Sequence, residues 1–184
     1  MKKMFFSLSI LILTIGFNGC ANKVHDYSVS ADNIMNLKDL SKSGHQIKIG
    51  EFTDSGKAET KVMCRLATPI GTPKGETFVS YIKNAFEKEL IISDLYSKNA
   101  QNSISVNLDD IYGSTVIGNA YWEFKATIKS SNGENYKIAS RYDYESSFSA
   151  MSACSEMQRS FVPAVQKLNG EIIKHPKFKS LLQK

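Results

Sequence analysis

Three segments in the second half of the chain alternate between apolar and polar residues. They cover residues 104–109, 116–129 and 136–148, and turn-forming residues separate them: Tyr112-Gly113-Ser114 after the first and Asn132-Gly133 after the second. Asn-Gly suits the positive φ angles of a tight hairpin. Strict alternation places one face of a strand in a core and the other in water, which is typical of antiparallel pairing. The pattern therefore predicts three antiparallel strands with one buried face.

Two other segments carry apolar residues at steps of three and four, the period of an amphipathic helix. The apolar positions are Phe78, Ile82, Ala85, Phe86 and Leu90 in the first segment, and Cys154, Met157, Phe161, Val165, Leu168 and Ile172 in the second. Thr72 and Pro73 have the residue types of a cap and a first helical position, so we expect the first helix to start there. We expect the second helix to bend or restart at Pro163, because a proline ring clashes with the carbonyl four residues back.

A fold class follows from these elements and from one more strand. Residues 47–52 alternate and predict a short first strand, whereas residues 53–74 hold Gly, Ser and two prolines and indicate a long loop. The predicted order is strand, helix, three strands, helix. Two helices with single apolar stripes and a sheet with one apolar face satisfy each other in a two-layer α+β sandwich. We expect one such domain over residues 47–184, with a mostly antiparallel four-stranded sheet and both helices on one face.

The first 19 residues have the layout of a bacterial secretory signal. Lys2 and Lys3 precede an apolar run over residues 4–17. That run is shorter than the ~20 residues that a membrane-spanning helix needs. The Phe17-Asn18-Gly19-Cys20 end resembles a lipobox, where the signal peptidase of lipoproteins cuts before an acylated cysteine. Cleavage at another site in an ordinary secreted protein is the alternative.

An acylated Cys20 would carry a diacylglycerol and an amide-linked acyl chain such as palmitate, and two or more such signals give stable anchoring. Ala21 after the cysteine, by analogy with the sorting rule of enteric bacteria, indicates the inner leaflet of the outer membrane, facing the periplasm. Residues 20–46 are polar and short of periodicity, so we expect a tether, with a local strand around residues 27–29 or a helical turn near residues 34–40. A flexible chain of that length reaches roughly 28 Å, which would lift the domain clear of the lipid.

The net charge points away from one class of partner. The chain has 184 residues and a formal charge of +5, and loss of Lys2 and Lys3 with the signal leaves +3. No dense basic stripe remains, so we do not expect a nucleic-acid partner. Lysines near the C-terminus could touch anionic headgroups, or they could belong to a solvated helix end that the helix dipole favours.

Three cysteines divide into two kinds. With Cys20 acylated, Cys64 and Cys154 are left. A cysteine pair in an oxidising compartment is most simply a disulfide. In the chain-entropy model this bond would stabilise the fold by about 4–5 kcal/mol. Two buried free thiols, or a redox-active pair, are the alternatives, although the chain has no C-x-x-C and no His next to either cysteine.

Catalytic and metal-binding motifs are missing from the sequence. The three histidines, His25, His45 and His175, lack the spacing of metal ligands, so we expect no metal and no other cofactor. Asp109 and Asp110 are neighbours that would point to opposite faces of a strand, which indicates a strand end rather than a catalytic pair. Because no general acid or base can be named, we expect the protein not to be an enzyme.

Aromatic residues gather on the predicted apolar face of the sheet. The set is Trp122, Phe124, Tyr136, Tyr142, Tyr144 and Phe148. These residues form either the core beneath the helices or the lining of a pocket. Buried tyrosine hydroxyls need partners, because an unpaired one costs ~1–3 kcal/mol. That demand leaves room for a binding edge made of Trp122, Tyr136, Tyr142 and Tyr144, where a lipid, glycan or peptide could lie.

The order of these features resembles the small bacterial envelope lipoproteins of the YajG type, and more distantly LptE and the auxiliary lipoproteins of envelope ABC transporters. The resemblance rests on Cys20, the polar segment after it, and the helix-like residues 78–90 followed by the strand-like residues 104–108. It implies a non-enzymatic accessory or assembly role in the cell envelope, with an envelope protein as partner. A ligand-binding module that uses the aromatic edge is the alternative.

Overall fold

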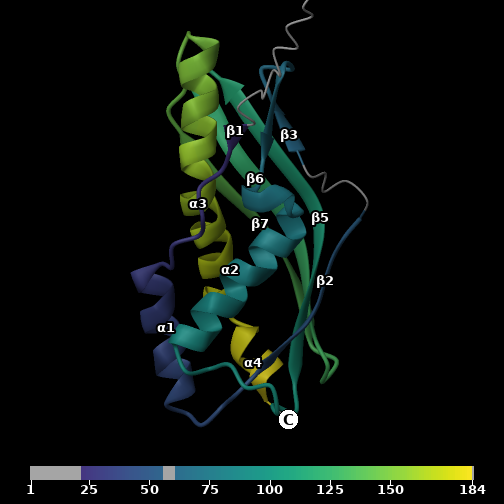
Figure 1. The fold of residues 1–184 in the computed structure, drawn as a ribbon. Helices are drawn as coiled ribbons and strands as arrows, with labels where there is room; N and C mark the ends of the chain where they lie inside the picture. Colours follow the sequence, from purple (N-terminus) through teal and green to yellow (C-terminus); the bar gives the residue numbers. More distant parts are fainter. Residues whose placement is uncertain (1–21, 56–60, 184) are drawn as a thin grey trace, which may run out of the picture.

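The main sheet has four strands and confirms the predicted α+β class. The structure is a computed structural model, and it describes residues 22–55 and 61–183. The strands of this sheet are β2 (Lys48–Asp54), β5 (Ser103–Val116), β6 (Asn119–Ser130) and β7 (Asn135–Tyr144). They lie in the order β2-β5-β6-β7 (Figure 1). β2 runs parallel to β5, and the other two pairs are antiparallel, so the sheet is mixed but mostly antiparallel.

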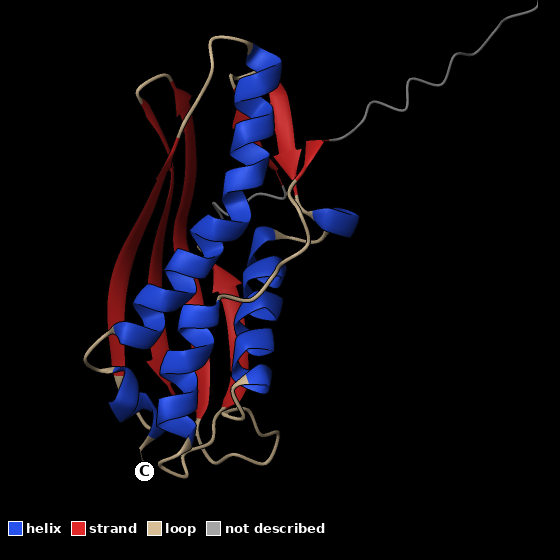
Figure 2. Cartoon of the chain, turned by 90° about the vertical axis from the view of Figure 1, so that its left-hand side faces the viewer, coloured by secondary structure: helices blue, strands red, loops and turns tan. Residues whose placement is uncertain are grey.

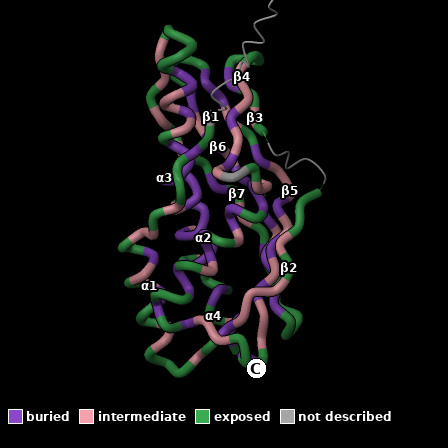
Figure 3. Tube along the Cα trace, in the orientation of Figure 1, coloured by how far each residue is buried: buried purple, intermediate pink, exposed green. Residues whose placement is uncertain are grey.

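Two long helices cover one face of this sheet, as the apolar stripes predict. They are α2 (Phe78–Ile92) and α3 (Ala150–Lys174), and the buried positions lie where these helices face the strands (Figures 1 and 3). Trp122 of β6 and Phe161 of α3 are fully buried, with ring centroids 4.9 Å apart. The core is therefore the aromatic layer between the sheet and the helices.

The start of α2 corrects the predicted boundary. The cap is Thr77, whose side chain accepts a hydrogen bond from the Ser80 N–H at 3.0 Å. Thr72 instead precedes a short 3-10 turn, η1 (Pro73–Gly75). Both threonines are followed by a plausible first turn, but an N-cap contributes only when its oxygen meets a free backbone N–H two or three residues later. Thr77 meets that condition.

Helix α3 continues through Pro163 without a break. It bends about halfway along its length (Figure 2). The proline removes one N–H from the helix ladder. Buried side chains on both sides, Phe161 and Val165, hold the two halves on the same core. The bend thus lets one helix follow the twisted sheet.

A bulge in β5 overturns the predicted turn at residues 112–114. The pairing of β5 with β6 shifts between Leu108 and Asp110, and the strand then continues to Val116. A bulge inserts one residue and moves the alternation by one position. Ile111 is accordingly buried and Tyr112 exposed. At Gly113, an added Cβ would meet the Met157 methyl group and the Trp122 ring, so α3 packs closely over this glycine.

A second, smaller sheet occupies most of the predicted loop. It consists of β1 (Asn22–Lys23), β4 (Thr68–Gly71) and β3 (Lys61–Cys64), in the order β1-β4-β3. β3 and β4 are antiparallel, and their turn has Arg65 and Leu66 at φ angles of 51° and 57°. Strands of four residues are too short to display a period, which is why the sequence suggested a loop here.

The segment predicted to be a tether is part of the folded domain. Its described residues, 22–46, include β1 and helix α1 (Ala31–Ser41), which packs against α2 and α3. Val24 and Leu37 are buried. Because only one narrow face of α1 enters the core, its composition stays polar. The prediction of a flexible spacer is wrong for these residues.

The C-terminal turn packs under the domain. Helix α4 (Phe178–Leu182) buries three apolar side chains, and Ser130 at the end of β6 donates a hydrogen bond to the Leu181 carbonyl at 2.8 Å. Among the described residues, no helix is both long enough and apolar enough to cross a bilayer.

A buried carboxylate holds the N-terminal segment on the helices. Glu89 of α2 is fully buried, and its oxygens accept hydrogen bonds from the Tyr27 hydroxyl, the Ser30 N–H, and the side-chain amides of Asn33 and Asn169. Burial raises the pKa of Glu89 above its ordinary value, although these donors oppose the shift. The carboxyl thus joins residues 27–33 to both long helices.

The raised pKa of Glu89 predicts an unusual pH dependence. A carboxyl that binds its proton more tightly in the folded state stabilises the fold below its ordinary pKa of 4.5, and this stabilisation is lost as pH rises through the folded pKa. The free energy of unfolding, measured with urea from pH 4 upward, should therefore fall more steeply in the parent than in Glu89→Gln. Equal slopes in the two proteins would contradict this assignment. Glu87→Gln, on the same helix and with a more exposed side chain, is the matched control.

Candidate functional site

Three connections meet at one end of the molecule. They are the β3–β4 turn at residues 65–67, the β5–β6 turn at 117–118, and the loop at 145–149 between β7 and α3 (Figure 1). We call this region the disulfide end, because Cys64 at the end of β3 is bonded to Cys154 in the first turns of α3.

The disulfide confirms the pairing expected from the sequence. The Cα atoms of Cys64 and Cys154 are 5.7 Å apart, and both side chains are buried. The bond joins residues separated by 90 positions. It therefore fastens the small sheet to α3.

Hydrogen bonds fix the rest of this end. The guanidinium of Arg65 donates to the Ser147 carbonyl at 2.5 Å. The Ser146 hydroxyl donates to the Thr115 carbonyl at 2.9 Å, and the Tyr144 hydroxyl donates to the Ser114 carbonyl at 2.8 Å. Each bond joins a different pair of elements, so the three connections form one surface.

Large apolar side chains are exposed on this surface. The set, which we call the apolar patch, is Met63, Leu66, Tyr112, Val116, Ile117, Phe148 and Met151. Leu66 is 93% exposed, Phe148 87% and Met151 82%. Single exposed apolar residues are normal on a soluble protein, but a gathered set marks an interaction site.

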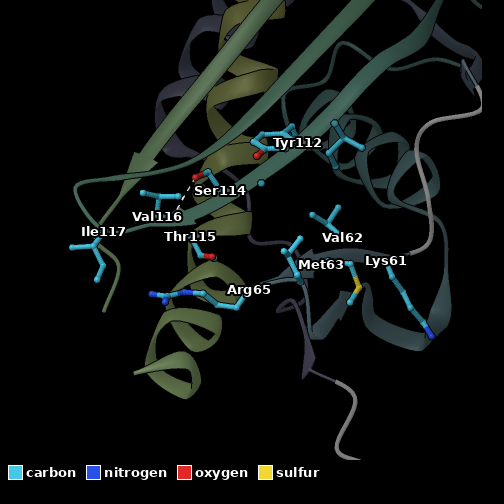
Figure 4. Close-up of a pocket in the computed structure, with 12 residues that line it drawn as sticks. Lys61, Val62, Met63, Arg65, Tyr112, Ser114, Thr115, Val116 and Ile117 are labelled. Atoms are coloured by element: carbon cyan, nitrogen blue, oxygen red, sulfur yellow. Dashed lines mark hydrogen bonds between the residues drawn. The ribbon is translucent and has the colours of Figure 1, made fainter. Parts of the chain in front are cut away.

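A groove of about 760 Å³ runs through the patch between β3 and β5. Val62 and Met63 line it from β3, and Tyr112 and Val116 line it from β5 (Figure 4). Lys61 and Arg65 supply the charge among the described residues of this lining, which include no Asp, Glu, His or Cys. The groove can therefore hold apolar groups and an adjacent anion.

The aromatic binding edge predicted from the sequence does not exist as an open surface. Trp122 is fully buried, and its Nε1 donates to the Met157 carbonyl and the Ser160 hydroxyl, both at 3.1 Å. Tyr136 is buried and its hydroxyl donates to the Ile172 carbonyl at 2.8 Å. Backbone carbonyls of α3 thus accept the hydrogen bonds of Trp122 and Tyr136, whose polar atoms were expected to lie at an open edge of the sheet.

The remaining members of the aromatic set divide between the core and the surface. Tyr142 is partly buried against the core, as is Tyr144, whose hydroxyl bonds to β5. Phe124 is fully buried. Phe148 lies beyond the end of β7 and belongs to the apolar patch. The first alternative, that the aromatic set forms the core beneath the helices, is therefore confirmed for Trp122, Phe124 and Tyr136. The alternative of a binding edge is wrong for Trp122 and Tyr136.

The described His, Cys, Asp and Glu side chains form no metal-binding cluster, and the two neighbouring aspartates are engaged separately. In the described parts of the chain, no cluster of three His, Cys, Asp or Glu residues could hold a metal ion. Asp109 accepts hydrogen bonds from Asn107 and Thr127, whereas Asp110 faces Lys125 at 3.9 Å. The two neighbouring carboxyls are thus engaged separately, on different partners.

Comparison with known proteins adds no relative. No family model matches this sequence, and no curated protein matches it either. Cys20 and the signal segment of residues 1–19 lie outside the described residues.

The disulfide should be needed for the order of this end. Replacing both cysteines, Cys64→Ala with Cys154→Ala, should lower the free energy of unfolding by about 2–5 kcal/mol, because the unfolded chain regains a long loop. Hydrogen exchange should then accelerate in residues 61–71 before it does in the paired centres of β6 and β7. Unchanged stability, or alkylation of both cysteines in the denatured, unreduced parent, would contradict the bond.

Proposed function

We propose that this protein is a lipid-anchored envelope lipoprotein with a non-enzymatic accessory or assembly role, located on the inner leaflet of the outer membrane and facing the periplasm. The observation that carries the proposal is the position of the first described strand. β1 begins at Asn22, two residues after the lipobox-like cysteine, and pairs with β4. An anchor at Cys20 would therefore hold a folded domain directly at the membrane.

The candidate site supports an accessory role rather than a chemical one. The described residues of its lining combine apolar side chains with Lys61 and Arg65 and include no carboxylate or imidazole. Such a surface recognises another surface or an amphiphilic molecule by burying apolar area. The partner under this proposal is an envelope protein that the anchored domain holds or assists.

Acylation of Cys20 is the first test. Cys20→Ser should abolish labelling with a radioactive fatty acid and release the protein from the membrane fraction, because the thiol that accepts the diacylglycerol is gone. The variant with Cys64→Ala and Cys154→Ala is the matched control and should keep its label. Labelling that survives Cys20→Ser would refute the anchor.

A second function is favoured by the groove between β3 and β5. Its volume of about 760 Å³ and apolar lining would suit the acyl chain of a lipid. This candidate moves the predicted ligand-binding role from the closed aromatic edge to an open site.

Affinity purification from crosslinked envelopes separates the two functions. An assembly role predicts that one envelope protein is recovered reproducibly with the parent and is lost with Leu66→Asp. Met35→Asp, on the exposed side of α1, should leave recovery unchanged. A co-purifying lipid without any protein partner would sink the assembly role and support the ligand-binding one.

A further inference from the structure

We propose that the disulfide end is a membrane-contacting surface, in which the apolar patch enters the interface of an anionic lipid bilayer. The inference rests on the proposed anchor at Cys20. It adds an orientation of the domain, which the anchor alone does not specify.

The first step is the path of the chain into the domain. β1 is parallel to β4, with Asn22 opposite Ile70 and Lys23 opposite Gly71. β4 starts at Thr68, immediately after the turn that carries Leu66. Continued backward from Asn22, the direction of β1 therefore leads to the β3–β4 turn and the patch.

The second step is the short length of chain between the proposed anchor and the domain. Two residues span at most about 7 Å, so an acylated Cys20 must lie within that reach of Asn22. The segment behind Asn22 is held in place: the Val24 N–H donates to the Gly71 carbonyl at 2.8 Å, and the Tyr81 hydroxyl donates to the His25 carbonyl at 2.7 Å. An anchored domain is consequently brought to the bilayer with the start of β1 toward the lipid.

The third step is the composition of the apolar patch, which this orientation brings to the bilayer. The three most exposed patch residues lie in connections that meet at this end: Leu66 in the β3–β4 turn, and Phe148 and Met151 where the loop at 145–149 passes into α3. Large apolar side chains of this kind insert into the boundary between headgroups and acyl chains. Arg65, next to Leu66 in the same turn, attracts anionic headgroups, and Lys61 adds a second positive charge farther along the groove.

Helices α1 and α2 also carry exposed apolar residues. They are Met35 on α1 and Ile91 and Ile92 at the end of α2, and the exposed Lys38 and Lys88 lie near them in sequence. Helix α1 and the end of α2 lie away from β1 and β3 (Figure 1). They provide control sites that the same anchor would keep out of the bilayer.

Tryptophan quenching by brominated lipids tests the orientation. The acylated full-length protein is reconstituted into phosphatidylethanolamine and phosphatidylglycerol vesicles whose acyl chains carry bromine. Leu66→Trp and Phe148→Trp should each lose their added fluorescence in these vesicles, whereas Met35→Trp should keep it. The signal of the parent, which comes from the buried Trp122, is subtracted.

Vesicle flotation keeps the failure of the anchor distinguishable from the failure of the orientation. If the protein does not float with the vesicles, the proposed anchor is refuted and this inference with it. If the protein floats but Leu66→Trp and Phe148→Trp are not quenched, the anchor stands and the patch faces away from the lipid, free for a protein partner. That outcome, or equal quenching at Met35→Trp, would overturn the membrane-contacting surface.

A variant that removes the patch supplies an independent readout. In the mature chain from residue 20 onward with Cys20→Ser, which has neither the apolar signal segment nor the acyl chains, sedimentation with phosphatidylglycerol vesicles depends on the surface alone. Adding Leu66→Ser, Phe148→Ser and Met151→Ser should abolish this residual binding, and adding Met35→Ser should not. The binding should also weaken as salt rises, because screening reduces the attraction of Lys61 and Arg65 to the headgroups. Equal binding of the two sets would overturn the proposal.

Discussion

The buried carboxyl of Glu89 is the interaction on which the arrangement of this protein depends. It accepts hydrogen bonds from Tyr27, Ser30 and Asn33 on the N-terminal side and from Asn169 of α3. A buried carboxyl is costly unless it is hydrogen-bonded. The N-terminal segment therefore completes a site that the helices cannot satisfy alone. Its docking turns a polar stretch into α1 and places β1 in the small sheet.

The disulfide holds the small sheet, which includes β1, at the other end of the domain. Cys64 and Cys154 fasten β3 to α3, and Arg65 then bonds to the loop before α3. β4 pairs with β3 on one side and with β1 on the other. The first described strand, β1, and the apolar patch are thus parts of the same end of the domain. Because β1 is paired within this end, a proposed anchor at Cys20 would also orient the domain on the membrane.

Local patterns predicted the centre of the fold well. The alternation in β6 and the helical steps in α2 and α3 are each set by a few neighbouring residues, and the aromatic core followed from them. Prediction failed where the period was broken or too short to see. The bulge after Leu108 shifted the alternation of β5 by one residue. The strands β3 and β4 have four residues each and are too short to show an alternation of apolar and polar positions.

By itself, the sequence determined the α+β class, the buried face of the sheet and the pairing of Cys64 with Cys154. Only the tertiary structure decided that residues 22–46 are not a tether, that Trp122 and Tyr136 are closed beneath α3, and that Leu66 and Phe148 share one end. The physical reason is the separation of the partners. Tyr27 lies 62 positions from Glu89, and Arg65 lies 82 from Ser147, so no local pattern records their contacts.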